Sequence, residues 1–377
     1  MAERIVVGGG IVGTSVAYHL ADRGASVTLY ERAGTLGSAT TGMSSLGFRQ
    51  YGHDGVQMAM KRYGKRLYNE FGAGDDEAIQ FDATEVLLLA TTDAGAESLE
   101  RKHASAAGAG AAGELLAGEG VPAAVMLPEL RHDAVTAAVH RPNAGYFSAP
   151  EPLVDAFARR AERSGARIRT GATVTDLVVE GGAVAGVRVD GERHAAETVV
   201  AAAGPWNNEI ASWAGVDVPL RQQRLHFLEL ELGRPLSRPL PKVRHVETGV
   251  TFRGRTRDRV LAYRTAPAED PYEAGADLDP GAAAAVPESV KLTVLEAAET
   301  VLPALADADV AYEDVAYPSR TPDGNPVVGR TGRPGFVLAG TNSEGIQLAP
   351  AIGNVVASLL EEDPPAYHER VAPTRFD

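Results

Sequence analysis

The stretch from residue 4 to residue 31 constrains the fold most, because it combines the signals of a strand, a glycine turn, a helix and a second strand. Residues 5–7 form a purely apolar run, as expected of a parallel strand buried on both faces. Gly8, Gly10 and Gly13 follow at once in the spacing GxGxxG. These glycines allow a tight turn, a close backbone approach to a pyrophosphate, and packing of the helix on the strand. The stretch therefore predicts a dinucleotide-binding unit rather than an ordinary glycine-rich turn.

The residues after the turn narrow the choice of cofactor. A helix that starts at Ile11 and Val12 would direct its free N–H groups at phosphate oxygens. The second strand ends at Glu31, where a carboxylate can accept both hydroxyl groups of an adenosine ribose. Because an acid at this position disfavours a ribose 2′-phosphate, the stretch predicts FAD or NAD.

Length and charge exclude several classes of protein. A chain of 377 residues is long for one core, which predicts two interleaved domains. The formal charge of -14 argues against nucleic-acid or anionic-membrane partners, since both need a basic surface. No apolar run approaches the length of a membrane span, and a strand begins by residue 4, which leaves no room for a cleavable signal. We therefore expect a cytoplasmic protein.

The sequence contains no cysteine. This excludes disulfides, thiolate metal sites, iron–sulfur clusters and a flavin attached through a thioether. No metal site is predicted.

Two later segments also have features of a cofactor site. The small, polar run over residues 33–48 is expected to place hydroxyl groups against a ligand, although a flexible surface loop has the same composition. An apolar strand over residues 198–203 ends in a glycine, which is a second place where backbone can approach a cofactor. The candidate residues in these segments are Thr40, Thr41, Ser44, Ser45, Ala203, Gly204 and Trp206.

The middle of the chain has a different pattern. Between residues 218 and 263, apolar and charged residues alternate, which predicts a mostly antiparallel sheet with one solvated face. Helical patterns occur at residues 56–71, 94–117, 152–164 and 289–305, and residues 272–285 have the composition of a loop. A strand at residues 336–339, a glycine turn and a helix from about residue 346 repeat the arrangement of the first stretch. The cofactor is therefore expected to contact both ends of the chain.

Four separated blocks resemble the flavin-dependent amine oxidoreductase family of D-amino-acid oxidase, glycine oxidase and monomeric sarcosine oxidase. The blocks are GGGIVGTSVAYHLADRGASVTLYER, the small-residue loop through Arg49, VVAAAGPWNNEIASWAG, and TPDGNPVVGRTGRPGFVLAGTNSEGIQLAPAIG. Together they span nearly the whole chain, and the last is the most specific. The resemblance implies an α/β fold, α+β overall. A Rossmann-like FAD-binding domain would comprise residues 1–80, 150–217 and 313–377, with an inserted, mostly antiparallel substrate-binding domain at residues 81–149 and 218–312.

The resemblance also assigns residues to FAD. It implies that Glu31 contacts the ribose, that Arg32 lies near the adenine, and that the Val174 backbone contacts the adenine edge. Residues 203–204 would lie beside the dinucleotide, and the turn at residues 340–346 would lie at the isoalloxazine ring. There a helix N-terminus would stabilise the anionic reduced flavin. The cofactor candidates at this turn are Gly340, Asn342, Ser343, Glu344, Gly345, Ile346 and Gln347.

The implied reaction transfers a hydride from the carbon that bears an amine to flavin N5, and water hydrolyses the resulting imine. Arg49 matches an arginine that holds the substrate carboxylate in sarcosine oxidases, with a structural ion pair as the alternative role. The corresponding arginine of glycine oxidase falls at Pro318 here, so Arg320 replaces it only if the loop shifts. Gln347 stands in place of a substrate-binding lysine of sarcosine oxidases.

Other departures from the family concern flavin attachment and the electron acceptor. Ala316 stands where sarcosine oxidases attach flavin through cysteine, and residues 39–42 lack the histidine that tethers flavin in some related dehydrogenases. We therefore expect FAD to be bound non-covalently. The motif VLAYR at residues 260–264 aligns near the oxygen-activating lysine of sarcosine oxidases but contains no lysine. The protein is therefore either an oxidase that uses O2 or a dehydrogenase that passes its electrons to another acceptor.

The function has alternatives, and so have several candidate side chains. The substrate is expected to be a small amine or amino acid, and oxidation of a 2-hydroxy acid on the same fold is the alternative. That reaction would need a base, for which His226 is the candidate. A non-catalytic FAD-binding assembly factor is a third alternative.

Further substrate-site candidates are Arg224, Arg253, Tyr263 and Tyr317, each of which also suits a solvated charge or a packing role, and Glu344 also suits a helix cap.

Overall fold

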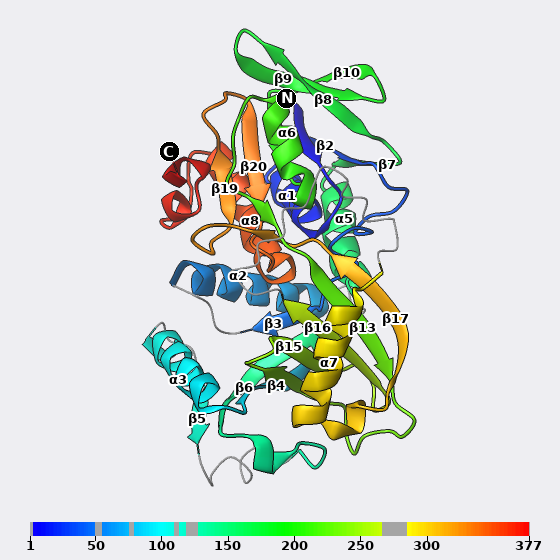
Figure 1. Ribbon diagram of the computed structural model, residues 1–377. Coiled ribbons are helices and arrows are strands. Elements are labelled where there is room, and N and C mark those ends of the chain that lie inside the picture. Colours follow the sequence, from blue (N-terminus) through cyan, green and yellow to red (C-terminus); the bar gives the residue numbers. More distant parts are fainter. Residues whose placement is uncertain are drawn as a thin grey trace.

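The computed structural model describes residues 3–49, 55–74, 79–108, 113–117, 127–265 and 285–376. Two sheets organise this part of the chain, one of six strands and one of nine (Figure 1). Both chain ends lie in the half of the molecule that is built on the six-stranded sheet (Figure 1). Within the described ranges, no helix combines the length and the hydrophobicity that crossing a membrane requires.

The six-stranded sheet has the order β19-β20-β11-β1-β2-β7. All neighbouring strands are parallel except β19 and β20, which are antiparallel. The first stretch of the sequence therefore forms the centre of this sheet, flanked by strands from the middle and the end of the chain. The strands are β1 (Glu3–Val7), β2 (Ser26–Glu31), β7 (Arg167–Thr170), β11 (Thr198–Ala201), β19 (Val327–Arg330) and β20 (Phe336–Gly340).

Helices and a small sheet cover the two faces of the six-stranded sheet. Helices α1 (Ile11–Asp22), α5 (Glu151–Arg163) and α8 (Gly345–Leu360) share one buried core, which α2 (Gly55–Gly72) joins through its contacts with α8. The other face packs against the three-stranded sheet of β8, β9 and β10 and against α6 (Asn207–Trp213). The small strands are β8 (Val174–Glu180), β9 (Ala183–Val189) and β10 (Glu192–Ala195).

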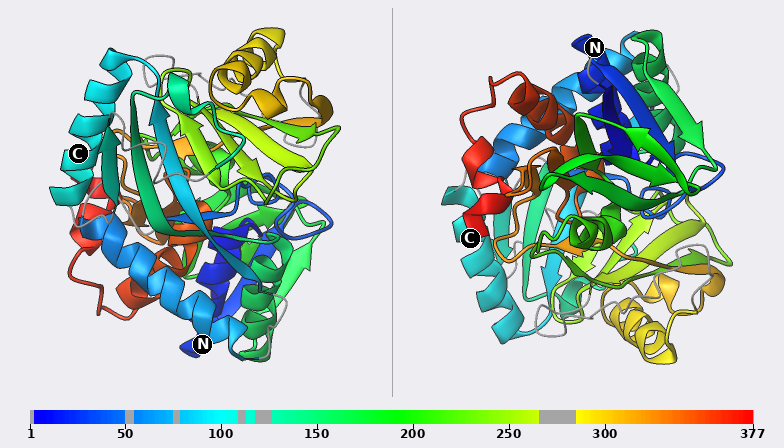
Figure 2. Two further views of the ribbon diagram at one scale, coloured as in Figure 1. Left: turned by 90° about the horizontal axis from the view of Figure 1, so that it is seen from below. Right: turned by 90° about the horizontal axis from the view of Figure 1, so that it is seen from above.

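The nine-stranded sheet has the order β17-β13-β16-β15-β14-β4-β6-β3, with β5 also paired to β6. It is antiparallel except between β14 and β4. In Figure 2, α3 (Asp93–Gly108) and α7 (Glu288–Val301) lie at opposite ends of this sheet. Its strands are β3 (Gly47–Arg49), β4 (Phe81–Ala90), β5 (Glu114–Ala117), β6 (Ala137–Phe147), β13 (Leu225–Glu231), β14 (Lys242–His245), β15 (Val250–Gly254), β16 (Arg259–Thr265) and β17 (Asp309–Ala316), and β12 (Arg221–Gln222) pairs separately with β18 (Ser319–Arg320).

The structure confirms the predicted α/β class and corrects one helix. The alanine-rich pattern at residues 94–117 predicted a single helix, but α3 ends at Gly108 and residues 114–117 form β5. Pairing of β5 with the edge of β6 outweighs the local helix propensity there. The loop predicted at residues 272–285 lies outside the described residues, apart from residue 285. The predicted domain boundaries remain a proposal.

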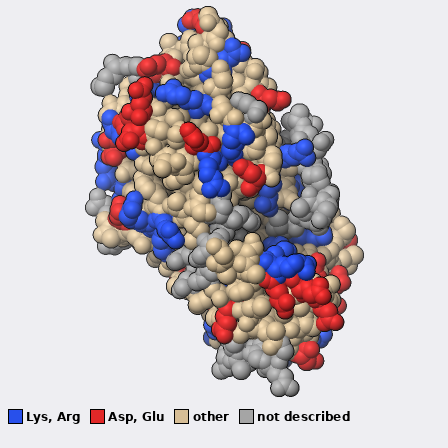
Figure 3. Space-filling view, turned by 90° about the vertical axis from the view of Figure 1, so that its left-hand side faces the viewer, with Lys and Arg blue, Asp and Glu red and all other residues tan. Residues whose placement is uncertain are grey.

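Figure 3 shows one face of the molecule, on which charged side chains of both signs occur. On the face in Figure 3, described Lys and Arg side chains are interspersed with Asp and Glu. This face presents no continuous basic surface among the described residues, which agrees with the net charge of -14.

Candidate active site

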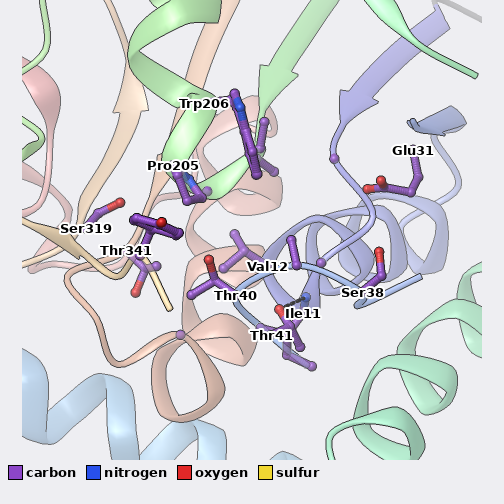
Figure 4. A pocket seen from close by; sticks show the side chains of 18 of the residues that line it. Ile11, Val12, Glu31, Ser38, Thr40, Thr41, Pro205, Trp206, Ser319 and Thr341 are labelled. Carbon is purple, nitrogen blue, oxygen red and sulfur yellow. Dashed lines mark hydrogen bonds between the residues drawn. The ribbon is translucent and has the colours of Figure 1, made fainter. Parts of the chain in front are cut away.

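A pocket of about 870 Å³ opens at the carboxyl ends of the parallel strands. Its lining comes from the segments that follow β1, β2, β11 and β20, together with residues of the nine-stranded sheet. Figure 4 shows Val12, Thr40, Trp206 and Thr341 around one space, each from a different segment. A ligand in this pocket would therefore contact residues from both ends of the chain.

Two glycines allow α1 to begin directly against the end of β1. A Cβ atom on Gly13 would lie 1.9 Å from the Gly8 carbonyl oxygen. A Cβ atom on Gly8, whose φ is +107°, would lie 2.7 Å from the Ala202 carbonyl oxygen. Thr41 Oγ1 accepts a hydrogen bond of 3.2 Å from the Ile11 N–H, which ties the following loop to the first turn of α1 (Figure 4). The geometry fits a glycine turn that receives a pyrophosphate.

Backbone hydrogen bonds fix the orientation of the Glu31 carboxylate at the pocket. The Gly9 N–H donates to Oε2 at 2.6 Å, and the Ala33 N–H donates to Oε1 at 2.8 Å. Because each carboxylate oxygen accepts more than one hydrogen bond, both can also receive ribose hydroxyls. Nearby, the Arg32 guanidinium carbon lies 3.9 Å from the ring centroid of Trp206, and both residues line the pocket.

Two hydroxyl groups in the pocket lining have no partner within the described part of the chain. Thr40 Oγ1 and Thr341 Oγ1 are buried, and neither makes a hydrogen bond there. Buried polar atoms in native structures are nearly always hydrogen-bonded. These two atoms therefore fit a pocket whose ligand supplies polar groups of its own.

Arg253 is a buried cation that contacts the pocket lining through Ser45 without itself being one of the lining residues. Its residue is only 7% exposed, and its Nη1 donates a hydrogen bond of 2.7 Å to the carbonyl oxygen of Ser45, which lines the pocket. The guanidinium carbon lies 3.7 Å from the ring centroid of Tyr146. The Nε atom is buried and has no hydrogen-bond partner among the described residues. Burial lowers the pKa of this guanidinium, so a negatively charged ligand would stabilise it.

A second cation lies next to Arg253 on the same face of the nine-stranded sheet. The register of β14 and β15 pairs Val243 with Phe252, which makes Lys242 and Arg253 the next neighbours across the two strands. Lys242 is 9% exposed, and its Nζ atom lies 5.7 Å from the ring centroid of Tyr263. Like charges opposite each other on adjacent strands destabilise a sheet. Their proximity in a buried place fits a site for an anion.

Helix α2 supplies contacts that the sequence did not reveal. Tyr68 Oη donates a hydrogen bond of 2.7 Å to the Ile346 carbonyl oxygen, and Lys61 Nζ lies 2.7 Å from a carboxylate oxygen of Glu344. Together with Gln57, these residues recur at helical spacing on one face of α2, which is a sequence signal for a contact face. The signal does not reveal that this face packs on the end of the pocket.

Comparison with known proteins identifies the family. The family described as FAD dependent oxidoreductase, abbreviated DAO, matches residues 4–359. The chain belongs to this family. The resemblance drawn from the four sequence blocks is therefore confirmed, and the glycine turn, Glu31 and the two unpartnered hydroxyls fit FAD, on which the family depends.

Relatives of the DAO family match most of this chain. It is 29% identical to the 4-methylaminobutanoate oxidase (formaldehyde-forming) of Paenarthrobacter nicotinovorans, over 96% of this chain and 44% of that protein. It is 26% identical to the glycine oxidase of Geobacillus kaustophilus, over 96% of this chain and 93% of that enzyme. Among solved structures, L-proline dehydrogenase from P. horikoshii has a TM-score of 0.83 at 24% identity, with 100% of this chain and 97% of that chain covered. The chain spans less than half the length of the curated relatives that it matches first.

Most of the residues predicted to bind cofactor line the pocket. Five of them are not among the described residues that line it: Gly13, Gly340, Asn342, Glu344 and Gln347. Gly13 packs behind the turn, and Asn342, Glu344 and Gln347 are buried away from the pocket. Those that line it are Gly8, Gly10, Ile11, Val12, Glu31, Arg32, Thr40, Thr41, Ser44, Ser45, Val174, Ala203, Gly204, Trp206, Ser343, Gly345 and Ile346.

Of the predicted substrate-site residues, Tyr317 lines the pocket. The side chain of Arg49 lies outside the described residues. Arg320 is not among the described residues that line the pocket, and its Nε donates a hydrogen bond of 2.6 Å to Gln223 Oε1.

His226 also lies away from the pocket. Its neighbours on β13, Leu225 and Phe227, both line the pocket, so alternation along the strand directs His226 to the opposite face. Burial, followed by the nearby Arg224 and Arg264 charges, lowers the pKa of its imidazole. The His226 side chain is therefore not placed to act as the base that oxidation of a 2-hydroxy acid in this pocket would need.

Proposed function

We propose that this chain binds FAD non-covalently and oxidises the C–N bond of a small amine that carries a carboxylate, such as an amino acid or an N-methyl amino acid. The observation that carries the proposal is the continuity of the pocket. It extends from the glycine turn at Gly8, past Thr341, to Phe227 and Tyr317 on the nine-stranded sheet. A dinucleotide and a small substrate can therefore share one cavity.

The residues of the chain divide the work of such a reaction. The FAD that this pocket would hold would supply a hydride acceptor for the carbon that carries the amine, and water would hydrolyse the resulting imine. Leu225, Phe227 and Tyr317 form an apolar wall that excludes water and positions the substrate. Arg253, with Lys242 beside it, supplies positive charge for the substrate carboxylate. Arg49 remains a second candidate for that role.

The names of two relatives support this substrate class. One acts on 4-methylaminobutanoate and the other on glycine, and both substrates combine an amine with a carboxylate. The position of His226 on the opposite face of β13 disfavours the alternative of 2-hydroxy-acid oxidation, because that reaction needs a base at the substrate.

Denaturation is expected to release all of the flavin from the purified protein. Covalent flavin is commonly attached through cysteine or histidine; the chain has no cysteine, and none of the described residues that line the pocket is a histidine. Acid precipitation followed by centrifugation measures the result from the yellow colour of the supernatant and of the pellet. Flavin that stays with the pellet after washing would contradict non-covalent binding.

Anaerobic mixing with substrate panels tests the reaction itself. Amino acids, N-methyl amino acids and 2-hydroxy acids are added separately, and the loss of flavin absorbance is followed. We expect at least one carboxylate-bearing amine to bleach the flavin and the 2-hydroxy acids to leave it oxidised. Bleaching by 2-hydroxy acids alone would contradict the proposed function, and so would the absence of bleaching by a broad panel of amines.

A further inference from the structure

The turn between β20 and α8 has a side that faces the pocket and a side that faces α2. Thr341, Ser343 and Gly345 line the pocket. Asn342 and Glu344, which alternate with them, are buried on the other side, where Asn342 Nδ2 donates a hydrogen bond to the Gly324 carbonyl oxygen. Each residue that faces the pocket is thus held by a neighbour that is anchored behind it.

A buried ion pair connects this turn to α2. Lys61 Nζ lies 2.7 Å from Glu344 Oε2, and the two side chains are only 3% and 7% exposed. Gly64, one turn further along α2, permits a close approach, because a Cβ there would lie 2.6 Å from the Gln347 carbonyl oxygen. Tyr68 Oη then donates to the Ile346 carbonyl oxygen at 2.7 Å. One face of α2 therefore holds the first residues of α8.

The pair also sets the charge at the start of α8. Helix α8 runs from Gly345 to Leu360, and Glu344 is its N-cap residue. The N-terminal end of a helix carries partial positive charge, and a carboxylate beside it offsets that charge. The Lys61 ammonium in turn offsets the carboxylate. With both charges present, the positive end of α8 remains available to the pocket, which Gly345 and Ile346 line.

We infer that Lys61 is a positioning residue of the flavin site, which neutralises Glu344 so that the start of α8 stabilises the negative charge that FAD gains on reduction. This inference rests on the proposed function, since it requires FAD in the pocket beside the turn. Lys61 is not one of the described residues that line the pocket, and it would act through Glu344 and the helix. Its effect is expected mainly in the reduction potential of the flavin.

Opposite charge changes at the two positions provide the test. In Lys61→Met the Glu344 carboxylate loses its compensating charge, so reduction becomes about tenfold less favourable, which is about 30 mV for a two-electron couple. Glu344→Gln leaves the ammonium in excess and is expected to shift the potential the other way. The double variant is expected to return close to the wild-type value. The measurement is the midpoint potential of the bound flavin, by equilibration with a reference dye, always against the wild type at the same pH. Lys61→Met is measured at alkaline pH, where a buried carboxylate is ionised, and Glu344→Gln at mildly acidic pH, where a buried ammonium keeps its proton.

Lys65→Met is the matched control on the same helix. The Lys65 Nζ atom lies 3.3 Å from the ring centroid of Phe81 rather than at the turn, so its loss should leave the potential unchanged. If Lys61→Met does not fold, Glu344→Gln and the double variant still carry the test, because the first should exceed the second in potential. Single variants that shift the potential in the same direction, or not at all, would overturn the role of Lys61. Wild-type protein that binds no FAD would instead overturn the proposed function, and the inference with it.

Discussion

Replacing Arg253 with methionine is expected to slow reduction of the flavin by subsaturating substrate about 100-fold, with FAD content unchanged. The side chain is buried, its Nε has no hydrogen-bond partner among the described residues, and it adjoins the pocket at Ser45. Removing one member of a buried, hydrogen-bonded charge pair costs about 2–5 kcal/mol, and ~3 kcal/mol corresponds to roughly 100-fold. Rapid mixing under anaerobic conditions measures the rate, and the flavin absorbance of the purified variant measures its FAD content.

Arg255→Met is the control for this variant. Arg255 follows β15 directly, and its half-exposed guanidinium pairs with Glu229 at 3.2 Å. Loss of an exposed ion pair changes stability by only about 0–1 kcal/mol, and the reduction rate should stay close to that of the wild type. Equal rates for Arg253→Met and Arg255→Met would rule out the carboxylate role of Arg253. Partial recovery in Arg253→Lys would support it, because lysine keeps the charge but loses the planar fork.

Replacing Gly13 with alanine is expected to give a protein that is purified without FAD. The added Cβ would lie 1.9 Å from the Gly8 carbonyl oxygen, so α1 must move away from the end of β1. Overpacking of this kind costs about 1–3 kcal/mol, and more where backbone has to shift. The displaced helix no longer directs its N–H groups at the pyrophosphate. Flavin absorbance after purification, titration with added FAD and thermal unfolding of the apoprotein measure the two effects separately.

Gly34→Ala provides the comparison for this substitution. Gly34 lies three residues after Glu31, and a Cβ there would meet no heavy atom within 4 Å. This variant should retain FAD and the wild-type melting temperature. Wild-type FAD affinity in Gly13→Ala would show that the glycine turn does not receive the dinucleotide.

Local sequence patterns predicted those parts of the fold in which the strands and helices follow one another directly along the chain. The strand, glycine turn, helix and strand predicted at residues 4–31 depend on neighbours in sequence, and the structure confirms them. The nine-stranded sheet depends on contacts between distant segments. The parallel pairing of Lys242–His245 with residues 86–89 and the strand at residues 114–117 are examples, since each gains its stability from a partner that periodicity does not reveal.

The same distinction applies to the candidate site. The positions of glycines after apolar strands predicted which turns approach the pocket, but they did not predict the direction of each side chain within a turn. Glu344 was a candidate both for a cofactor contact and for a helix cap. It is the N-cap residue of α8 and pairs with Lys61, because α2 packs against the turn from behind. Arg253 was one of several candidates, and its burial beside Ser45 distinguishes it from the solvated arginines of the same sheet.

The most direct measurement compares one carboxylate-bearing amine with its own carboxamide as reductants of the bound flavin. The two molecules share the amine and the C–N bond, and they differ in the negative charge that Arg253 would meet. Under anaerobic, subsaturating conditions we expect the acid to bleach the flavin about 100-fold faster than the amide. Equal rates for the two, with the wild-type protein fully loaded with FAD, would contradict a site built for a carboxylate-bearing amine.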